Sequence, residues 1–419
     1  MQTAKPPLLT RPLLIFMGTM ILANIAGHMY QLLLPLYVQS LGANIGQVGL
    51  FFTLGAVAPL AFQILGGWLS DSIGRLQAIA IGSLAGAAGY IVFLVAPSWQ
   101  WLLLAIVAGA MARSFVAPSY QAFIAEQSTA ETRGQVYGLA EGLFMVVGVV
   151  GPPIGGYVSE HYGFKVMFAV AGVLYTVATV IRLVMARNAH HAEKATNGSR
   201  ERPTLAGLKN NLVAMTALIT AGGIITWIMV SDGVRDITYR LAFELQPLYM
   251  HNVAGLTNTQ IGWLASIASM MTMLFMTPAG WLSDKKGERI GIVAGFLLIV
   301  VGTAVFLNSR LFMGFAAAWI MFGLADALAG PAYNSLISKV VPEKLRGTAF
   351  GLFSTSIGVI SLPAPWIGAQ LWERFGPQVP FYVPMVATLL ILPIMWVKFK
   401  LPKAEAEKAP LAETAVSDA

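Results

Sequence analysis

The sequence has no cysteine, which excludes disulfides, thiolate nucleophiles and cysteine-ligated metals. It also lacks a phosphate-binding GxxxxGK(S/T) loop and an HExxH motif, so ATP-driven pumping and zinc-dependent hydrolysis have no support in the sequence. Charge is scarce, because only 11% of the 419 residues are Asp, Glu, Lys or Arg, whereas soluble domains usually carry about 25%. We therefore expect neither an enzyme nor a metal-binding protein.

Apolar residues dominate the chain, 57% of which is hydrophobic. A stretch of about 20 apolar residues can cross a bilayer as a helix, because a helix satisfies its own backbone hydrogen bonds. The sequence contains twelve such stretches; the first, 12–38, has no small-residue cleavage site and is interpreted as a retained helix. These features predict an all-α membrane protein with twelve transmembrane helices.

The net charge of +7 comes mainly from basic residues in the loops on one side of this arrangement. That asymmetry follows the positive-inside pattern and does not indicate a nucleic-acid surface. We therefore expect a multi-pass protein of the cell (cytoplasmic) membrane, with both termini in the cytoplasm and no nucleic-acid partner.

One hexapeptide occurs in two nearly identical copies. GGWLSD, which ends at Asp71, returns as AGWLSD, which ends 213 residues later at Asp284 (284 minus 71), and the same offset joins Pro118 to Pro331 and three further groups of residues. A constant offset over about 100 residues indicates a duplication into two pseudo-symmetric six-helix bundles. The expected parts are an N-terminal bundle (1–186), a cytoplasmic linker (187–211), a C-terminal bundle (212–398) and a disordered cytoplasmic tail (399–419).

The repeated loop resembles the signature loop of the major facilitator superfamily, G-x-L-(A/S)-D-(R/K)-x-G-(R/K)-(R/K), and together with the repeat the resemblance covers essentially the whole chain. It implies a transporter with its substrate site between the halves, and a loop that holds the cytoplasmic side shut by charge pairing to helix 11 or helix 5. Ser72, Leu76, Gln77 and Glu288 depart from the basic positions of the pattern, and an ordinary hydrophilic turn is the alternative. The gate candidates are Gly67, Asp71, Gly74, Arg75, Gly280, Asp284, Gly287 and Arg289.

Helix 5 carries GVVGPPIGG, which resembles the G-x-x-x-G-P-x-x-G-G motif of drug and proton antiporters in this superfamily, although Val147 stands at the first glycine position. The resemblance implies proton-coupled antiport. The alternative is a packing face, since small residues let helices approach closely and proline bends them. The motif residues are Gly148, Gly151, Pro152, Gly155 and Gly156.

Two opposite charges lie at matching places in the halves, Arg113 in helix 4 and Asp326 in helix 10, again 213 residues apart (326 minus 113). Ionisable groups at membrane depth are costly and usually face a cavity. We expect Asp326 to bind a proton or a cation, and Arg113 to hold it ionised or to compete with substrate for it. A permanent structural ion pair is the alternative.

Other polar residues extend this candidate site. Glu141 in helix 5 is a second proton-site candidate, with a gate or helix-capping contact as its alternative. Asn24, His28 and Gln31 follow one another at spacings of four and three, which places them on one face of helix 1. We expect that stripe to bind substrate, with His28 able to relay protons, or to make helix-to-helix hydrogen bonds.

The segment 231–250 permits two structures. Its charges recur every three to four residues and give the pairs Asp236/Arg240 and Arg240/Glu244. Hydropathy ends helix 7 at 231 and leaves an external amphipathic helix, whereas the repeat places helix 7 at 225–251 with these charges in the cavity. We favour one kinked helix, which makes Asp236 and Arg240 secondary binding candidates.

Together these features predict a secondary active transporter, a proton-coupled exporter of lipophilic or cationic small molecules such as drugs. We expect a monomer with substrate, protons and the bilayer as partners, and with a proton gradient in place of any cofactor. The alternatives are an importer or facilitator of a sugar or organic anion, a lipid or lysolipid flippase, and a transport-inactive receptor or scaffold on the same fold.

Overall fold

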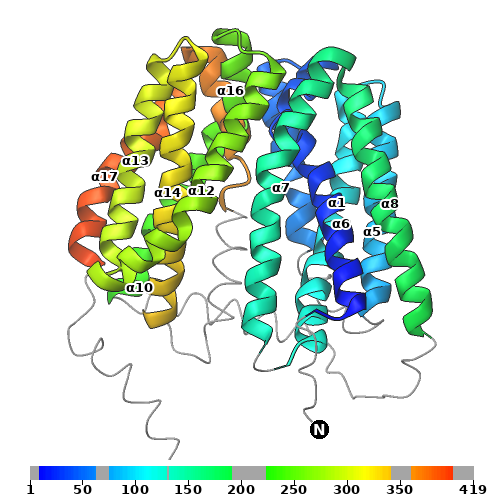
Figure 1. Ribbon diagram of the computed structural model, residues 1–419. Helices are drawn as coiled ribbons and strands as arrows, with labels where there is room; N and C mark the ends of the chain where they lie inside the picture. Colours follow the sequence, from blue (N-terminus) through cyan, green and yellow to red (C-terminus); the bar gives the residue numbers. More distant parts are fainter. Residues whose placement is uncertain (1–8, 63–74, 130–131, 191–222, 341–359, 400–419) are drawn as a thin grey trace, which may run out of the picture.

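The computed structural model describes residues 9–62, 75–129, 132–190, 223–340 and 360–399 (Figure 1). Ten helices within these residues are long and apolar enough to cross a membrane. The helices of the first half are α1 (Arg11–Tyr30), α2 (Leu34–Ser40), α3 (Ile45–Gly55), α5 (Arg75–Val95), η1 (Trp99–Trp101), α6 (Leu102–Gln127), α7 (Arg133–Tyr162) and α8 (Phe164–His190). Those of the second half are α10 (Gly223–Phe243), α11 (Gln246–Leu248), η3 (Tyr249–Val253), α12 (Asn258–Lys286), α13 (Glu288–Asn308), α14 (Phe312–Val340), α16 (Ala364–Phe375) and α17 (Val379–Lys398).

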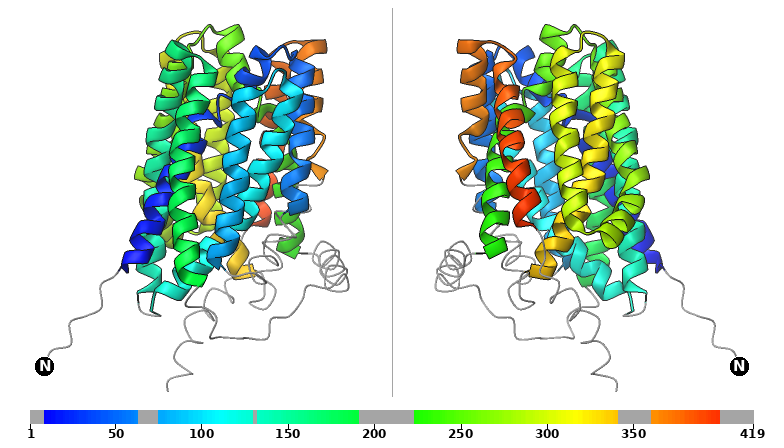
Figure 2. Two further views of the ribbon diagram at one scale, coloured as in Figure 1. Left: turned by 90° about the vertical axis from the view of Figure 1, so that its right-hand side faces the viewer. Right: turned by 90° about the vertical axis from the view of Figure 1, so that its left-hand side faces the viewer.

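The two sets of helices form two bundles that stand side by side, with their long helices running in one common direction (Figure 1, Figure 2). α1 begins and α17 ends at the same end of the molecule, at the bottom of Figure 1. We call this end the terminal side and the opposite end the far side. α8 continues to His190, so the first residues of the expected linker 187–211 are helical, and the rest of that segment lies outside the described residues.

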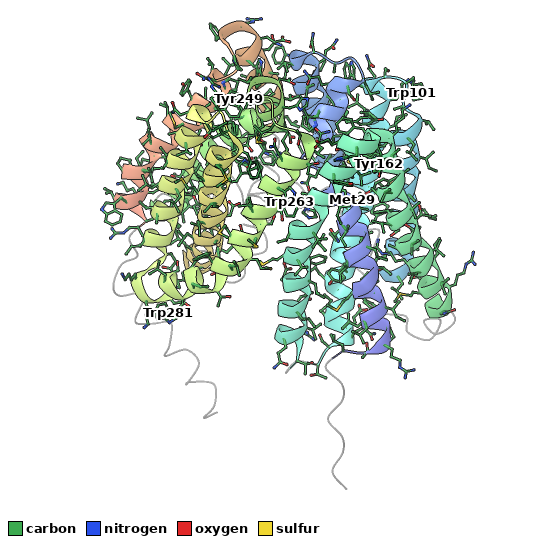
Figure 3. The ribbon with its side chains drawn as sticks, turned by 45° about the horizontal axis from the view of Figure 1, so that its top comes forward. Met29, Trp101, Tyr162, Tyr249, Trp263 and Trp281 are labelled. Carbon is green, nitrogen blue, oxygen red and sulfur yellow. The ribbon has the colours of Figure 1, made fainter. Side chains whose placement is uncertain are left out.

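The outer surface of both bundles is apolar. Val173 and Leu390, for example, are 63% and 68% exposed, which is what a lipid-facing side chain requires. Aromatic side chains are exposed near both ends: Trp101 and Tyr162 lie toward the far side and Trp281 at the opposite end (Figure 3). Aromatic residues favour the two membrane–water interfaces. The chain is therefore a multi-pass helical membrane protein.

Helix 1 and helix 7 are each interrupted by a proline at corresponding places. α1 ends at Tyr30 because Pro35 has no N–H and its ring clashes with the carbonyl four residues earlier. Pro247, 212 positions later (247 minus 35), interrupts the second half in the same way after Phe243. Residues 231–243 thus belong to α10, which confirms the single broken helix expected from the repeat and shows that helix 7 does not end at 231. Hydropathy placed the end of helix 7 too early because the charged residues of α10 lower the hydropathy of this segment. They remain in the helix because they pair with one another.

The second half contains one additional residue beyond this break. η3 is a π-helix, which takes up one more residue per turn than an α-helix, and the offset between the halves then rises from 212 to 213. Asn44 and Thr257, which are 213 apart (257 minus 44), begin α3 and α12 with the same capping box, completed by Gln47 and Gln260. The duplication therefore extends to individual helix caps.

The halves contact each other through two equivalent helix pairs, α7 with α12 and α3 with α16. A Cβ atom on Gly262 would lie 2.4 Å from the carbonyl oxygen of Pro152, and one on Gly49 would lie 2.6 Å from that of Pro365. Each glycine and each proline is related to its counterpart by the offset of 213, so a single contact is made twice. Only glycine permits the backbones to approach this closely.

Two glutamates join the halves on the far side. Glu373 Oε1 accepts a hydrogen bond of 2.8 Å from the N–H of Gly46, and Glu160 Oε2 accepts one of 2.9 Å from the N–H of Thr259. Each carboxylate lies at the first turn of a helix of the opposite half, where the helix dipole favours negative charge. We call this pair of interactions the far-side carboxylate contacts.

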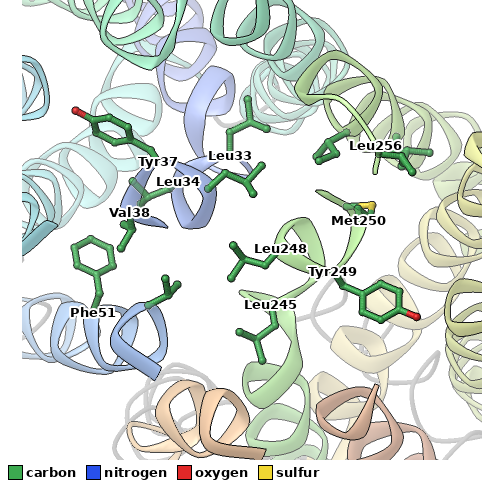
Figure 4. Packing of buried hydrophobic residues seen from close by; sticks show 14 of the residues in the cluster. Leu33, Leu34, Tyr37, Val38, Phe51, Leu245, Leu248, Tyr249, Met250 and Leu256 are labelled. Carbon is green, nitrogen blue, oxygen red and sulfur yellow. The ribbon is translucent and has the colours of Figure 1, made fainter. Parts of the chain in front are cut away.

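Buried apolar residues form one shared cluster on the far side and separate clusters toward the terminal side. Leu33 from the first half belongs to the same cluster as Leu248 and Met250 from the second (Figure 4). The cluster around Phe16 draws only on the first half, and the cluster around Phe296 only on the second.

The glycines of α7 show where the halves separate. A Cβ atom on Gly156 would lie 2.5 Å from the carbonyl oxygen of Asn258 on α12, whereas one on Gly142 or Gly138 would meet no described atom within 4 Å. Within the described residues, the halves are therefore closed together on the far side and apart toward the terminal side.

Candidate functional site

A cavity of about 650 Å³ lies against the inner face of the first half, and Phe243 and Glu244 at the break of helix 7 complete its wall. The polar residues of its lining are Asn24, His28, Tyr30, Gln31, Tyr90, Arg113, Tyr175, Arg182 and Glu244. Four residues predicted from the sequence, the helix 1 stripe and Arg113, thus meet in one place. In the part of the chain that the structure describes, no group of three or more His, Asp or Glu side chains could hold a metal ion.

The helix 1 stripe is held by its own helix and by α7. Asn24 Nδ2 donates to the carbonyl of Met20 at 2.7 Å. His28 is packed against α7 so closely that a Cβ atom on Gly151 would lie 2.7 Å from the Cβ atom of His28. Gln31 is exposed at the end of α1, where the helix breaks. The stripe therefore faces the cavity, and the glycine of helix 5 makes room for its histidine.

Arg113 projects from α6 into the cavity and its side chain is exposed. Among the described residues it makes no hydrogen bond and no ion pair. The hydroxyls of Tyr30, Tyr90 and Tyr175 are within electrostatic range of its guanidinium. Its donors are consequently available to a ligand.

Arg182 of α8 is a second cation in the cavity wall and was not among the site residues predicted from the sequence. Its side chain is 1% exposed, and it donates from Nε to Thr19 Oγ1 at 3.1 Å and from Nη1 to Ser83 Oγ at 2.9 Å. Its partners in the described segments are all neutral, and its guanidinium also lies over the ring of Phe16, 5.8 Å from the ring centroid. The signal was present in the sequence, because Arg182 is a charge inside a predicted span, as Arg113 is.

Three tyrosines surround these cations. The rings of Tyr30 and Tyr90 are 5.9 Å apart and meet edge to face, and those of Tyr90 and Tyr175 are 5.1 Å apart. A Cβ atom on Gly86 would lie 2.2 Å from the hydroxyl oxygen of Tyr175, so a glycine on α5 is required for that hydroxyl to reach its position. The tyrosines were not identified from the sequence, because tyrosine alone is not distinguishable from a core aromatic residue.

A separate charged cluster lies in the second half. Arg235 pairs with Asp232 at 2.6 Å, and Arg240 pairs with Asp236 at 2.8 Å, as the i,i+4 spacing predicted. Asp326 of α14 is exposed and has Arg235 as its charged neighbour. The expected interaction between Arg113 and Asp326 is absent from the described residues, where the two side chains project from different halves. Arg235 is the cation within electrostatic range of the carboxylate, and its own ion pair is with Asp232.

Glu141 lies outside the cavity lining. Its side chain is exposed on α7, and Tyr120 of α6 is within electrostatic range. Asp236 and Arg240 also lie outside the cavity lining, and they form an ion pair with each other.

The helix 5 motif lies in α7 and packs against two helices, α1 and α12. Gly151 and Gly155 lie against α1, where a Cβ atom on Gly155 would be only 1.8 Å from the carbonyl oxygen of Met29. Gly148 and Gly156 lie against α12 of the other half. The packing interpretation of the motif is therefore confirmed, and the motif connects the wall of the cavity to the contact between the halves.

The prolines of the motif leave a backbone carbonyl without its helical donor. Pro153 has no N–H, so the carbonyl of Val149, four residues earlier, loses its intrahelical hydrogen bond. Ser266 Oγ of α12 donates to that carbonyl at 2.6 Å. A serine of the second half thus replaces the missing bond in the first, which strengthens the contact between α7 and α12.

The gate motif is described only in its second copy. Gly67, Asp71 and Gly74 lie outside the described residues, and Arg75 begins α5 with a side chain that is likewise outside them. In the second copy Gly280 is within α12 and Asp284 is exposed, with no hydrogen bond or ion pair in the described segments.

The turn of the second copy depends on Gly287, whose φ of +90° lies in the left-handed region that favours glycine. Arg289 Nη1 donates to the carbonyl of Trp396 at 3.0 Å and the guanidinium lies over its ring. Glu288, which departs from the basic pattern, pairs with Lys339. Glu288 and Arg289 of this loop therefore contact α14 and α17, whereas the resemblance implied charge pairing to helix 11 or helix 5.

Comparison with known sequences gives matches along the whole chain. The family described as Major Facilitator Superfamily matches residues 14–243 and 237–417. A PmrA homolog of Lactococcus lactis, named as a multi-drug resistance efflux pump, is 26% identical over 377 residues, which are 87% of this chain and 88% of the relative. The quinolone resistance protein NorA of Staphylococcus aureus is 24% identical over 362 residues, or 85% of this chain and 88% of NorA. An uncharacterized MFS-type transporter of Methanocaldococcus jannaschii is 26% identical over 332 residues, covering 78% and 82%.

Solved structures agree in fold. A POT family transporter in complex with 5-aminolevulinic acid superimposes with a TM-score of 0.73 at 12% identity, covering 93% of this chain and 96% of that one. The nucleoside transporter NupG gives a TM-score of 0.73 at 13% identity, with 92% and 99% coverage.

Proposed function

The chain belongs to the major facilitator superfamily, and on that premise we propose that it is a secondary active transporter that exports lipophilic or cationic small molecules in exchange for protons. The relatives named as a multi-drug efflux pump and a quinolone resistance protein support drug-like substrates. The observation that carries the proposal is the cavity of about 650 Å³, whose wall combines residues of both halves. A site between two halves that rock against each other is what alternating access requires.

The conformation is one that an exporter must adopt to load its substrate. We place both termini in the cytoplasm, following the basic loops on that side of the sequence. The far side, closed by the shared apolar cluster and the far-side carboxylate contacts, then faces outward. The structure in this orientation is an inward-facing state, which receives a compound from the cytoplasm or the inner leaflet.

Asp326 is our proposed proton-binding carboxylate, and Arg235 takes the role that was predicted for Arg113. A carboxylate inside the membrane that alternates between a proton and a cationic neighbour couples proton movement to a change of conformation. The proton gradient supplies the energy, so no cofactor is needed. Both halves are in one chain, so a monomer is sufficient.

Transport in proteoliposomes under an imposed pH gradient tests the proposal. The panel contains cationic dyes, a quinolone, a sugar and a lysolipid, and both solute and proton movement are recorded. We expect gradient-driven transport of dyes or drugs that Asp326→Asn abolishes and that a protonophore collapses. Arg310→Gln, which removes an exposed charge outside the cavity lining, is the control and should transport normally. Movement of the compounds that is independent of pH, or unaffected by Asp326→Asn, would contradict proton coupling through this residue.

A further inference from the structure

We propose that Arg113, Tyr30, Tyr90 and Tyr175 form an anion subsite in the cavity, and that the transported compounds carry a carboxylate on an aromatic body. This inference rests on the proposed transport function and narrows its substrate class. Within the lipophilic small molecules of that function it selects organic anions and zwitterions, and it excludes the purely cationic compounds that the function also includes.

The first support is the charge of the lining. Among the cavity residues that the structure describes, Arg113 and Arg182 stand against one carboxylate, Glu244, which leaves an excess of one positive charge. A guanidinium does not lose its proton at any physiological pH, so protonation of Glu244 can only increase this excess. Unpaired positive charge at membrane depth is costly, and an anionic group of the substrate offsets that cost.

The second support is the accessibility of Arg113. It is exposed in the cavity, and no described side chain or backbone group occupies its donors. The planar guanidinium presents paired N–H groups that match the two oxygens of a carboxylate. The hydroxyls of Tyr30, Tyr90 and Tyr175, within electrostatic range of the guanidinium, can donate to the same oxygens.

The third support is the fixed position of Arg182. Thr19 and Ser83 hold its buried guanidinium by hydrogen bonds of 3.1 and 2.9 Å, so its charge has a fixed place in the cavity wall. Tyr175 lies within electrostatic range of it. Arg182 is therefore a positioning residue, which adds a permanent positive potential behind the tyrosines while Arg113 makes the direct contact.

The remainder of the wall suits an aromatic body. Phe51 and Phe52 of α3, Phe93 of α5 and Phe243 at the end of α10 line the same cavity. Phe93 is stacked on Phe168 with ring centroids 4.4 Å apart, which fixes the wall on that side. An aromatic compound buries its rings against these side chains while its carboxylate reaches Arg113.

Equilibrium binding to the purified full-length protein in nanodiscs tests the subsite without any gradient. The probes share one fluorescent body: 1-pyrenebutyric acid and its neutral methyl ester. The variants are Arg113→Gln, the conservative Arg113→Lys, and Arg310→Gln as the matched control, because Arg310 is an exposed arginine outside the cavity lining.

We expect the wild type to bind the acid about tenfold more tightly than the ester, as a charge-assisted, two-oxygen contact implies. Arg113→Gln should remove most of that preference while leaving ester binding within about twofold, which also shows that the variant is folded. Arg113→Lys should restore part of the preference, and Arg310→Gln should behave as the wild type. Equal binding of acid and ester by the wild type, or equal loss of both in Arg113→Gln, would overturn the subsite.

The two proposals fail in different ways. Selective binding of the acid with no proton-driven transport supports the subsite and rejects the antiport function. Proton-driven export of dyes without any preference for the acid rejects the subsite alone.

Discussion

Alanine at both Glu160 and Glu373 should shift the protein toward a state that is open on the far side. Each carboxylate accepts one backbone N–H of the opposite half, at 2.9 and 2.8 Å, and each lies at a helix N-terminus. Rocking the halves apart on that side must break both contacts. Their removal therefore lowers the free energy of the far-side-open state relative to the closed one.

The magnitude follows from the exposure of the two side chains. Both glutamates are exposed, so each contact stabilises the closed state by about 1 kcal/mol, the usual cost of losing a capping side chain. Two contacts give about 2 kcal/mol, which changes the ratio of the two states about 30-fold. Glutamine keeps an acceptor oxygen and loses only the charge, so the double glutamine variant should give a smaller shift.

The absence of cysteine makes a distance measurement direct. Gln100 in η1 and Met313 in the first turn of α14, which are 213 apart (313 minus 100), are exposed on the far side of the two halves. Spin labels on Gln100→Cys and Met313→Cys report the separation of the halves by double electron–electron resonance. Alanine at both glutamates should raise the population of long distances.

The control is Arg374→Ala, which changes an exposed charge next to Glu373 that has no interaction in the described segments. It should leave the distance distribution unchanged. If the double alanine variant is folded and its distribution coincides with that of the wild type, the far-side carboxylate contacts do not hold the closed state and the reasoning is refuted.

Two further substitutions test the contacts of helix 5 (α7). Gly155→Ala would place a Cβ atom 1.8 Å from the carbonyl oxygen of Met29, so we expect a lower melting temperature and loss of transport. Gly142→Ala is the control: its Cβ atom meets no described atom within 4 Å, so it should change neither the melting temperature nor transport. Ser266→Ala removes the donor to the carbonyl that Pro153 leaves free and should cost about 1–3 kcal/mol, measured as a lower thermal stability in detergent; an unchanged melting temperature would mean that another group satisfies that carbonyl.

The site could be predicted in part. The spacing of Asn24, His28 and Gln31 fixed their common face, and that face does line the cavity. The offset of 213 placed Arg113 and Asp326 at equal depth, but equal depth does not determine which helix faces which. Arg235 is the charged neighbour of Asp326 because α10 and α14 pack together within one half, and only that packing could reveal it.

By itself the sequence determined the properties that are local to a helix or to a repeat. Hydropathy established a helical membrane protein, the offset between GGWLSD and AGWLSD established two equivalent halves, and the repeat led to the broken helix 7. The tertiary structure decided which faces meet. The closing of the halves on the far side depends on close approaches such as that of Gly262 to Pro152, between residues distant in the chain. Periodicity along one helix carries no information on these contacts, because they depend on the shape of two surfaces at once.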